Sequence, residues 1–375
     1  MSDGWSELER DANGSLRADS IKFPAGMAAL ANQVHALGLK FGMYGDAGAK
    51  TCGGYPGSRG HEEADAALFA GFGVDYLKYD NCYADPDDPP RGRYEAMRDA
   101  LNATGRPIVY SLCDWGVAEP WLWAAGVGNS WRTTVDSAPN WRSVMHNLDG
   151  NVGLARFARP GAWNDPDMLQ VGNGLTPGEQ RSHFALWCLL KSPLMISSPL
   201  KGLDQTALAV LTAPEVIAVH RDKLGVAGDL IWKQARGGWR GGSKEIHAGP
   251  LTEGRRVVVM LNRAHAEERG GARITVRWDQ LGYTSDAVAT VRDLYARRDL
   301  GSFRRHFSAM VGPHDCLALV ITPGQQQSGS VNRRARDGRG APWDDGWRPW
   351  HAQPMYAMHD EDFEPASGAA GAAVL

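Results

Sequence analysis

Segments with the pattern of buried strands alternate with amphipathic helical segments from about residue 20 to about residue 200, and this alternation restricts the fold more than any other feature. Residues 24–37 place apolar side chains on one helical face and are followed by Gly38, a typical helix stop. Further helices are predicted near 61–71 and 91–102. Strands are predicted at six segments: 39–46, 74–80, 107–113, 128–134, 163–165 and 192–197.

This alternation predicts a parallel α/β sheet, because strands joined through helices run in the same direction. The spacing of about 20 to 35 residues between strands is typical of a (β/α)8 TIM-type barrel. A doubly wound sheet remains the alternative on the pattern alone. In a barrel, catalytic side chains are expected where the strands reach their carboxyl ends.

The pattern changes after residue 222, where short β-rich runs follow one another with few helical periods between them. These runs are 229–235, 255–264, 272–278, 288–296 and 316–323. We therefore predict three parts: a catalytic (β/α) barrel over 1–222, an antiparallel β-sandwich over 223–324, and an irregular or disordered tail over 325–375. The tail lacks any sustained hydrophobic period.

Composition restricts the partners of the chain. The 40 Lys and Arg residues nearly balance 43 Asp and Glu residues, so the sequence offers no basic footprint for nucleic acid. The sequence contains no run of 18 apolar residues, so no membrane span is predicted. The five cysteines lack zinc-ligand spacing, and nucleotide-binding motifs are absent, so we expect neither a metal nor a cofactor. The sequence is compatible with a homo-oligomer but does not define one.

The segment VDYLKYDNC carries the first candidate for chemistry. Strand alternation puts Lys78 and Asp80 on one face, with Asp80 at the carboxyl end of the strand. An ammonium beside a carboxylate keeps that carboxylate ionised, which suits a nucleophile. An ordinary buried ion pair is the alternative interpretation.

The segment NSWRTTVDS carries the second candidate, because Arg132 and Asp136 lie where another strand should leave the sheet. A second carboxylate at the same barrel mouth would complete the nucleophile and proton donor that glycoside hydrolysis requires. A surface salt bridge explains the same two residues equally well when they are taken alone.

Five segments in this order resemble the α-galactosidases (melibiases) of glycoside hydrolase family 27. They are the run from LKFGMYGD to YDNCY, followed by IVYSLCDWG, NSWRTTVDS, GAWNDPDMLQVGN and SPLMISSPL. The resemblance covers about residues 3–223, and the β-rich segment to about 324 resembles the family's C-terminal β-sandwich. It implies a retaining exo-glycosidase that removes terminal α-D-galactosyl residues from galactosides by double displacement.

The resemblance also implies roles for individual residues. Asp80 matches the nucleophile and Asp136 matches the acid/base. Cys52 and Cys82 match a pair that forms a disulfide beside the site. Asp165 and Asp167 are expected only to orient other groups. The residues implied to contact or line the sugar pocket are Tyr44, Lys78, Asp114, Trp115 and Arg132.

The sequence departs from the family at its N-terminus. Only Ser2-Asp3-Gly4-Trp5 corresponds to the D-D-x-W run of the family, with Asp3 at its second Asp. The first barrel strand and most of the second are therefore expected to be missing, which would leave an open sheet edge and a destabilised chain. No signal peptide is visible, although the resemblance implies a secreted protein.

Three other functions remain open. An α-N-acetylgalactosaminidase or a β-L-arabinopyranosidase would keep the mechanism and change the sugar. Asp114 and Trp115 are expected to fill the space that a 2-acetamido group needs, which favours galactose. A non-catalytic galactose-binding protein is the alternative from another class.

Overall fold

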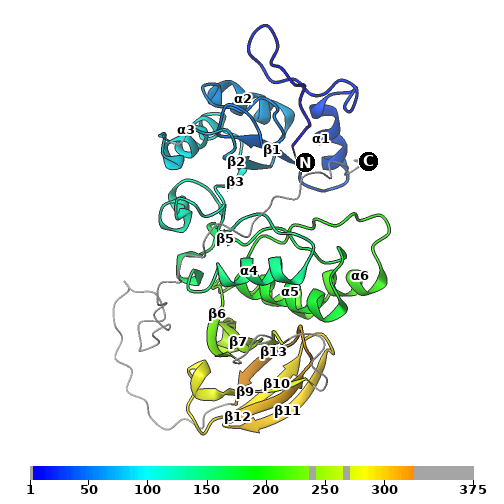
Figure 1. The fold of residues 1–375 in the computed structure, drawn as a ribbon, viewed down its shortest axis with the longest axis vertical. Coiled ribbons are helices and arrows are strands. Elements are labelled where there is room, and N and C mark those ends of the chain that lie inside the picture. The colour runs from blue at the N-terminus through cyan, green and yellow to red at the C-terminus, as the bar shows by residue number, and fades with distance from the viewer. Residues whose placement is uncertain (1–2, 86, 236–241, 265–270, 325–375) are drawn as a thin grey trace. The chain divides into compact units, whose positions relative to one another are not determined.

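The computed structural model describes residues 3–85, 87–235, 242–264 and 271–324. A five-stranded parallel sheet with the order β1-β2-β3-β4-β5 lies in the first part of the chain (Figure 1). Its strands are β1 (Gly42–Asp46), β2 (Tyr76–Asp80), β3 (Val109–Leu112), β4 (Ser130–Arg132) and β5 (Trp163–Asp165). The helices before and between them are α1 (Met27–Ala36), α2 (Glu62–Phe72), α3 (Pro90–Ala103) and α4 (Trp141–Asp149).

The order of these strands decides between the two predicted architectures. Each strand pairs with the next one along the chain, whereas a doubly wound sheet reverses its strand order at a switch point. The (β/α)-barrel prediction is therefore confirmed, as five consecutive strand units. The predicted helices at 24–37, 61–71 and 91–102 correspond to α1, α2 and α3.

One apolar core holds β1, β2 and β3 against α1, α2 and α3. Alternate strand residues point into it, because successive side chains of a strand face opposite sides of the sheet. Tyr79, Tyr94 and Tyr110 form its aromatic centre, with ring centroids 5.8 to 6.5 Å apart. The strand ends are thus anchored from the helical side, which leaves the opposite face for polar side chains.

The sixth predicted strand, at 192–197, is wrong as a strand. Within the described residues this segment makes only an isolated parallel bridge between Leu169 and Ile196. Pro166 follows β5 directly and has no N–H for a ladder, which explains why regular pairing stops at Asp165. Met195 and Ile196 are partly exposed instead of buried in a sheet.

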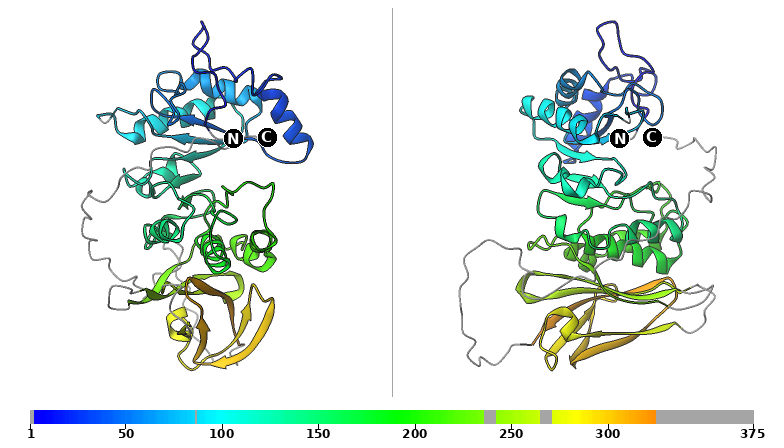
Figure 2. Two further views of the ribbon diagram at one scale, coloured as in Figure 1. Left: turned by 45° about the vertical axis from the view of Figure 1, so that its right-hand side comes forward. Right: turned by 60° about the vertical axis from the view of Figure 1, so that its left-hand side comes forward.

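The predicted β-domain is present as a six-stranded sheet, β11-β10-β13-β8-β7-β6, and a two-stranded sheet, β12-β9 (Figure 2). Apolar residues of the two sheets, among them Val258, Ile274 and Val291, form a separate core between them. The sequence patterns missed β7, β11 and β12. The strands are β6 (Asp229–Ala235), β7 (Ser243–Pro250), β8 (Arg256–Asn262), β9 (Ala272–Arg277), β10 (Val288–Asp293), β11 (Arg298–Arg304), β12 (His306–Val311) and β13 (Asp315–Pro323).

Helix α5 (Pro177–Leu190) joins the two parts of the fold. It packs against α6 (Gln205–Leu211), α7 (Pro214–His220) and the outer face of β8 and β13 in one apolar cluster. At the edge of this cluster Arg181 Nη2 lies 2.6 Å from Asp315 Oδ2. Nearly all of α5 is buried, so it is a rigid support for the loops that follow β5.

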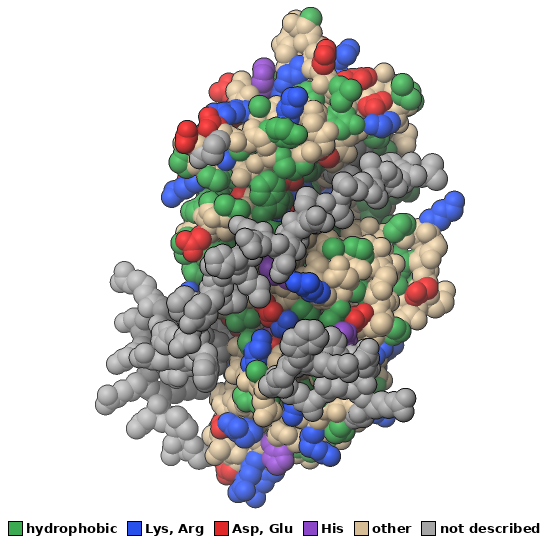
Figure 3. Space-filling view, in the orientation of Figure 1, with side chains coloured by type: hydrophobic (Ala, Val, Ile, Leu, Met, Phe, Trp, Pro, Cys, Tyr) green, Lys and Arg blue, Asp and Glu red, His purple; other side chains and the backbone are tan. Residues whose placement is uncertain are grey.

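The surface carries charges of both signs, interspersed on the face shown in Figure 3. None of the helices in the described ranges is long and apolar enough to cross a membrane. The predicted tail at 325–375 lies outside the described residues.

Candidate active site

Five parallel strands bring their carboxyl ends to one edge of the sheet, and the candidate residues gather there. Asp46 pairs in register with Asp80 across β1 and β2, and Arg132 pairs with Asp165 across β4 and β5. Residues far apart in sequence therefore become neighbours, as the sequence analysis predicts for a barrel.

Asp80 is nearly buried at the end of β2 and is held by two of the predicted partners. The Tyr44 hydroxyl donates to Asp80 Oδ2 over 2.9 Å, and Lys78 Nζ lies 3.7 Å from the same oxygen. Lys78 also lies over the Tyr44 ring. Burial raises the pKa of Tyr44 well above its usual value, so the phenol stays a neutral donor. The carboxylate is thereby fixed in orientation beside a cation.

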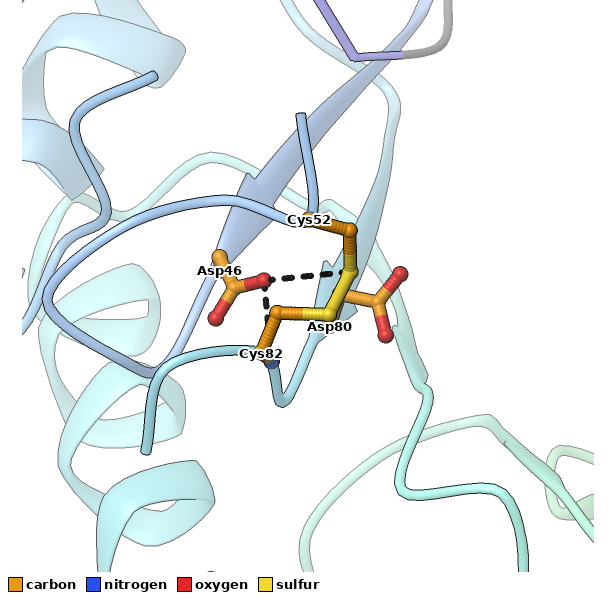
Figure 4. A group of neighbouring side chains, drawn as sticks. All are labelled: Asp46, Cys52, Asp80 and Cys82. Carbon is orange, nitrogen blue, oxygen red and sulfur yellow. Dashed lines mark hydrogen bonds between the residues drawn. A yellow bond between two sulfur atoms is a disulfide. The ribbon is translucent and has the colours of Figure 1, made fainter. Parts of the chain in front are cut away.

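Cys52 and Cys82 form the predicted disulfide, with an S–S distance of 1.99 Å. It joins the loop after β1 to the loop after β2, and it lies between the carboxylates of Asp46 and Asp80 (Figure 4). The Tyr44 hydroxyl is 3.4 Å from Cys52 Sγ. The crosslink therefore holds together the two strand ends that carry Asp80 and its donor.

Asp46, which the sequence analysis did not single out, supports this crosslink. Its carboxyl group accepts hydrogen bonds from the amides of Gly48 (2.8 Å) and Cys82 (3.2 Å). A Cβ at Gly48 would lie 1.9 Å from the Cys82 carbonyl oxygen, so only glycine allows the two loops to approach. Burial raises the pKa of Asp46 to about 8, against these amide contacts, which limits its negative charge beside Asp80 near neutral pH.

The four side chains around the disulfide lie as close together as metal ligands do, but their chemistry does not suit a metal ion. The potential ligand atoms of Asp46, Cys52, Asp80 and Cys82 lie within 4.8 Å of one another. The two sulfurs are bonded to each other, however, and a disulfide sulfur is not the thiolate that binds metal ions. The arrangement therefore serves to crosslink two loops.

Asp3 lies beside the same crosslink. Its Oδ2 accepts a hydrogen bond from the Gly53 amide over 2.6 Å, one residue after Cys52. Trp5 is buried and its indole N–H donates to the Tyr44 carbonyl over 2.8 Å. These contacts place the N-terminal segment against β1 at the candidate site.

Arg132 and Asp136 are joined by an ion pair of 3.0 Å between Arg132 Nη2 and Asp136 Oδ1. Arg132 is buried, whereas the Asp136 side chain is 79% exposed. The exposure of Asp136 follows from its place in the loop beyond β4, which ends at Arg132. Arg132 also lies 3.0 Å from Asp167 Oδ1.

Asp114 and Trp115 lie in the loop that follows β3. The Asp114 carboxylate accepts from the amides of Gly116 (3.2 Å) and Ala118 (3.4 Å), so its described hydrogen bonds stay within its own loop. Trp115 has a φ of 56°, and a Cβ on Gly116 would lie 2.2 Å from the Thr133 carbonyl oxygen. The loop is thus folded tightly onto the segment after Arg132.

Cys113, the residue before this loop, contacts the site although the sequence patterns did not single it out. Arg132 Nη1 lies 3.7 Å from its Sγ. Burial raises the pKa of Cys113 well above its usual value, so it is a neutral thiol. The sequence signal for Cys113 is its position at the carboxyl end of a strand. It directly follows β3, just as Asp80 is the last residue of β2.

The disulfide gives a direct prediction. A Cys52→Ser/Cys82→Ser variant should lose about 3 to 4 kcal/mol of unfolding free energy, because the crosslink closes a loop with a sequence separation of 30. Denaturant unfolding of both proteins with and without dithiothreitol measures this loss. Reductant should lower the stability of the unsubstituted chain and leave the variant unchanged. Peptide mapping that joined Cys52 to any other cysteine would contradict the pairing.

The chain is similar to known proteins over both parts of its fold. Residues 1–222 match the family model described as Alpha galactosidase A, and residues 241–321 match Alpha galactosidase C-terminal beta sandwich domain. The chain is 45% identical to Alpha-galactosidase 2 of Arabidopsis thaliana over 86% of this chain and 79% of that protein.

Solved structures show the same similarity. α-Galactosidase I from Mortierella vinacea superposes with a TM-score of 0.79 and 35% identity, over 85% of this chain and 86% of that one. The α-galactosidase from Saccharomyces cerevisiae with raffinose gives a TM-score of 0.80 and 30% identity, over 86% and 88% of the two chains.

Proposed function

Because the chain belongs to the α-galactosidases of glycoside hydrolase family 27, we propose that the carboxylates at its sheet edge hydrolyse galactosides by a retaining double displacement. The protein is an α-galactosidase, which removes terminal α-D-galactosyl residues. The observation that carries the mechanism is the fixed carboxylate of Asp80, held by Tyr44 and Lys78 at the end of β2.

In the first step Asp80 attacks the anomeric carbon and the bond to the leaving oxygen breaks. Asp136 gives its proton to that oxygen, so the aglycone leaves as a neutral alcohol and a β-linked galactosyl-enzyme remains. In the second step Asp136 takes a proton from water, and the water oxygen displaces Asp80. Two inversions restore the α configuration. The exposure of Asp136 supports this role, because an acid/base must reach both the aglycone and water.

The pocket assignments extend this proposal. Tyr44, Lys78 and Arg132 carry hydrogen-bond donors at the sheet edge and are proposed to hold sugar hydroxyls. Asp3 is proposed to contact the sugar from the N-terminal segment. Asp114 and Trp115 are proposed to line the pocket. Asp114 contributes by holding the shape of its loop through hydrogen bonds to the Gly116 and Ala118 amides.

The sugar specificity can be tested with three chromogenic substrates. We expect p-nitrophenyl α-D-galactoside to exceed the 2-acetamido analogue by about 100-fold or more in kcat/KM, since Asp114 and Trp115 are proposed to fill the space that a 2-acetamido group needs. p-Nitrophenyl β-L-arabinopyranoside lacks the hydroxymethyl group and should be poorer by at least about tenfold. Preference for the acetamido sugar would move the protein to α-N-acetylgalactosaminidase, and galactose binding without turnover would favour the non-catalytic alternative.

We also propose that the protein works in an oxidising compartment, as expected of a secreted enzyme. The Cys52–Cys82 disulfide supports this, because structural disulfides are rare in the reducing cytosol.

A further inference from the structure

Asp167, two residues after β5, contacts two neighbours of the proposed acid/base Asp136: its ion-pair partner Arg132 and the backbone amide of Ser137. Its Oδ1 lies 3.0 Å from Arg132 Nη1, and its Oδ2 accepts a 2.7 Å hydrogen bond from the Ser137 amide. Ser137 directly follows Asp136 in the chain. One buried carboxylate thus holds the cation that pairs with Asp136 and the backbone next to Asp136.

Arg132 is shared between two carboxylates of very different exposure. Nη1 faces buried Asp167, while Nη2 donates to the Thr134 carbonyl and to Asp136 Oδ1, both over 3.0 Å. An unpaired guanidinium beside Asp136 would favour its ionised form, which is the wrong form for a proton donor. Asp167 supplies the negative charge that offsets Arg132.

Asp167 has a backbone conformation that its surroundings maintain. Its φ of 79° is rare for a residue with a side chain. Such a conformation persists only where surrounding contacts hold it in place. The Asp167 amide donates to Asp165 Oδ1 (2.9 Å), and its carbonyl accepts from the indole of Trp187 on α5 (2.7 Å). These two contacts hold the backbone from which the Asp167 carboxylate reaches Arg132.

A second residue after β5 supports the same segment. Gln170 Nε2 donates to the Ser137 carbonyl (3.1 Å) and to its hydroxyl (2.8 Å). Asp167 therefore holds the Ser137 amide and Gln170 holds the Ser137 carbonyl. The backbone after Asp136 is fixed in this way, although the Asp136 side chain itself reaches solvent.

We propose that Asp167 is the positioning residue of the acid/base, setting both the place of Asp136 and its affinity for the catalytic proton. This inference rests on the proposed role of Asp136. The other titratable groups around Arg132 are Cys113, Asp165 and Lys78, and none of them contacts the backbone next to Asp136 among the described hydrogen bonds.

The test is a double-mutant cycle with a pH profile. Asp167→Asn and Asp167→Gly remove the charge and suit a positive φ, so both should fold. Each is made in the native chain and in an Asp136→Asn background. kcat/KM is measured for melibiose and for an activated aryl α-galactoside. Asp279→Asn is the matched control, because Asp279 pairs with Arg277 at 3.0 Å in the β-sandwich, and it should leave activity and pH profile unchanged.

In the native background, both Asp167 variants should lower kcat/KM for melibiose by about 10- to 100-fold and affect the aryl substrate much less. The alkaline limb should move to lower pH by about half a pH unit or more, because the Arg132 cation, no longer offset by Asp167, favours loss of the catalytic proton. With Asp136→Asn present, replacing Asp167 should change the aryl rate by less than about threefold.

Independent, additive losses or an unmoved alkaline limb would overturn this inference while leaving the role of Asp136 intact. Full activity of Asp136→Asn alone would instead remove the acid/base assignment, and this inference with it. The two failures are therefore distinguishable.

Discussion

Asp80→Ala should reduce the hydrolysis of every α-galactoside by at least about 10⁴-fold, since it removes the proposed nucleophile. Added azide should restore turnover on an activated aryl galactoside. Azide would enter from the side that the Asp80 carboxylate vacates and would displace the aglycone in a single inversion. The product should therefore be β-galactosyl azide, identified by NMR.

The control for this experiment is the fold of the variant. Asp80 is buried against Tyr44, so its loss could destabilise the sheet edge as well as the chemistry. Thermal unfolding and galactose binding measured on the same sample separate the two effects. Retained folding together with unaffected turnover would rule out Asp80 as nucleophile, and α-galactosyl azide as the product would rule out attack from its side.

The part of the site that the sequence could predict is the part that strand geometry dictates. Asp80 ends a buried strand, and parallel strands share one carboxyl edge. The family resemblance added what periodicity does not contain, namely which carboxylate plays which role and that Cys52 pairs with Cys82. Hydrophobic alternation alone left Arg132 and Asp136 indistinguishable from a surface ion pair.

The part that could not be predicted depends on irregular backbone. Trp115 and Asp167 have positive φ values. A positive φ at a residue other than glycine cannot be predicted from the residue type. These two conformations occur beside Asp114, which bonds within its own loop, and at Asp167, which pairs with Arg132. Likewise, the exposure of Asp136 follows from the loop beyond β4, and a strand-based pattern says nothing about loop paths.

The misassigned strands have a similar explanation. Segment 192–197 is apolar enough for a strand, yet strands need a continuous partner ladder, and the ladder of β5 ends before Pro166. Conversely, β11 (Arg298–Arg304) is mostly exposed and carries charged residues, so burial patterns do not reveal it. Its pairing with β10 is what makes it a strand.

Asp136→Ala should slow the enzyme in a manner that depends on the leaving group. Without a proton donor, substrates with sugar aglycones should lose about 10²- to 10⁴-fold in kcat/KM. An activated aryl galactoside needs little protonation, so it should still form the galactosyl-enzyme and then accumulate it for want of a base. Mass spectrometry should find galactose attached to Asp80. Equal losses on both substrates would contradict the acid/base role.

Azide then distinguishes the two aspartates by stereochemistry. In Asp136→Ala the anion would attack the β-linked intermediate on Asp80 and give α-galactosyl azide after two inversions, the opposite anomer from Asp80→Ala. Because the contacts of Asp136 within the described ranges run through Arg132 and the backbone at Ser137, its removal should leave the Asp80 contacts with Tyr44 and Lys78 intact. The same anomer from both variants, or β-galactose as the first product of the native enzyme, would be incompatible with retention through Asp80.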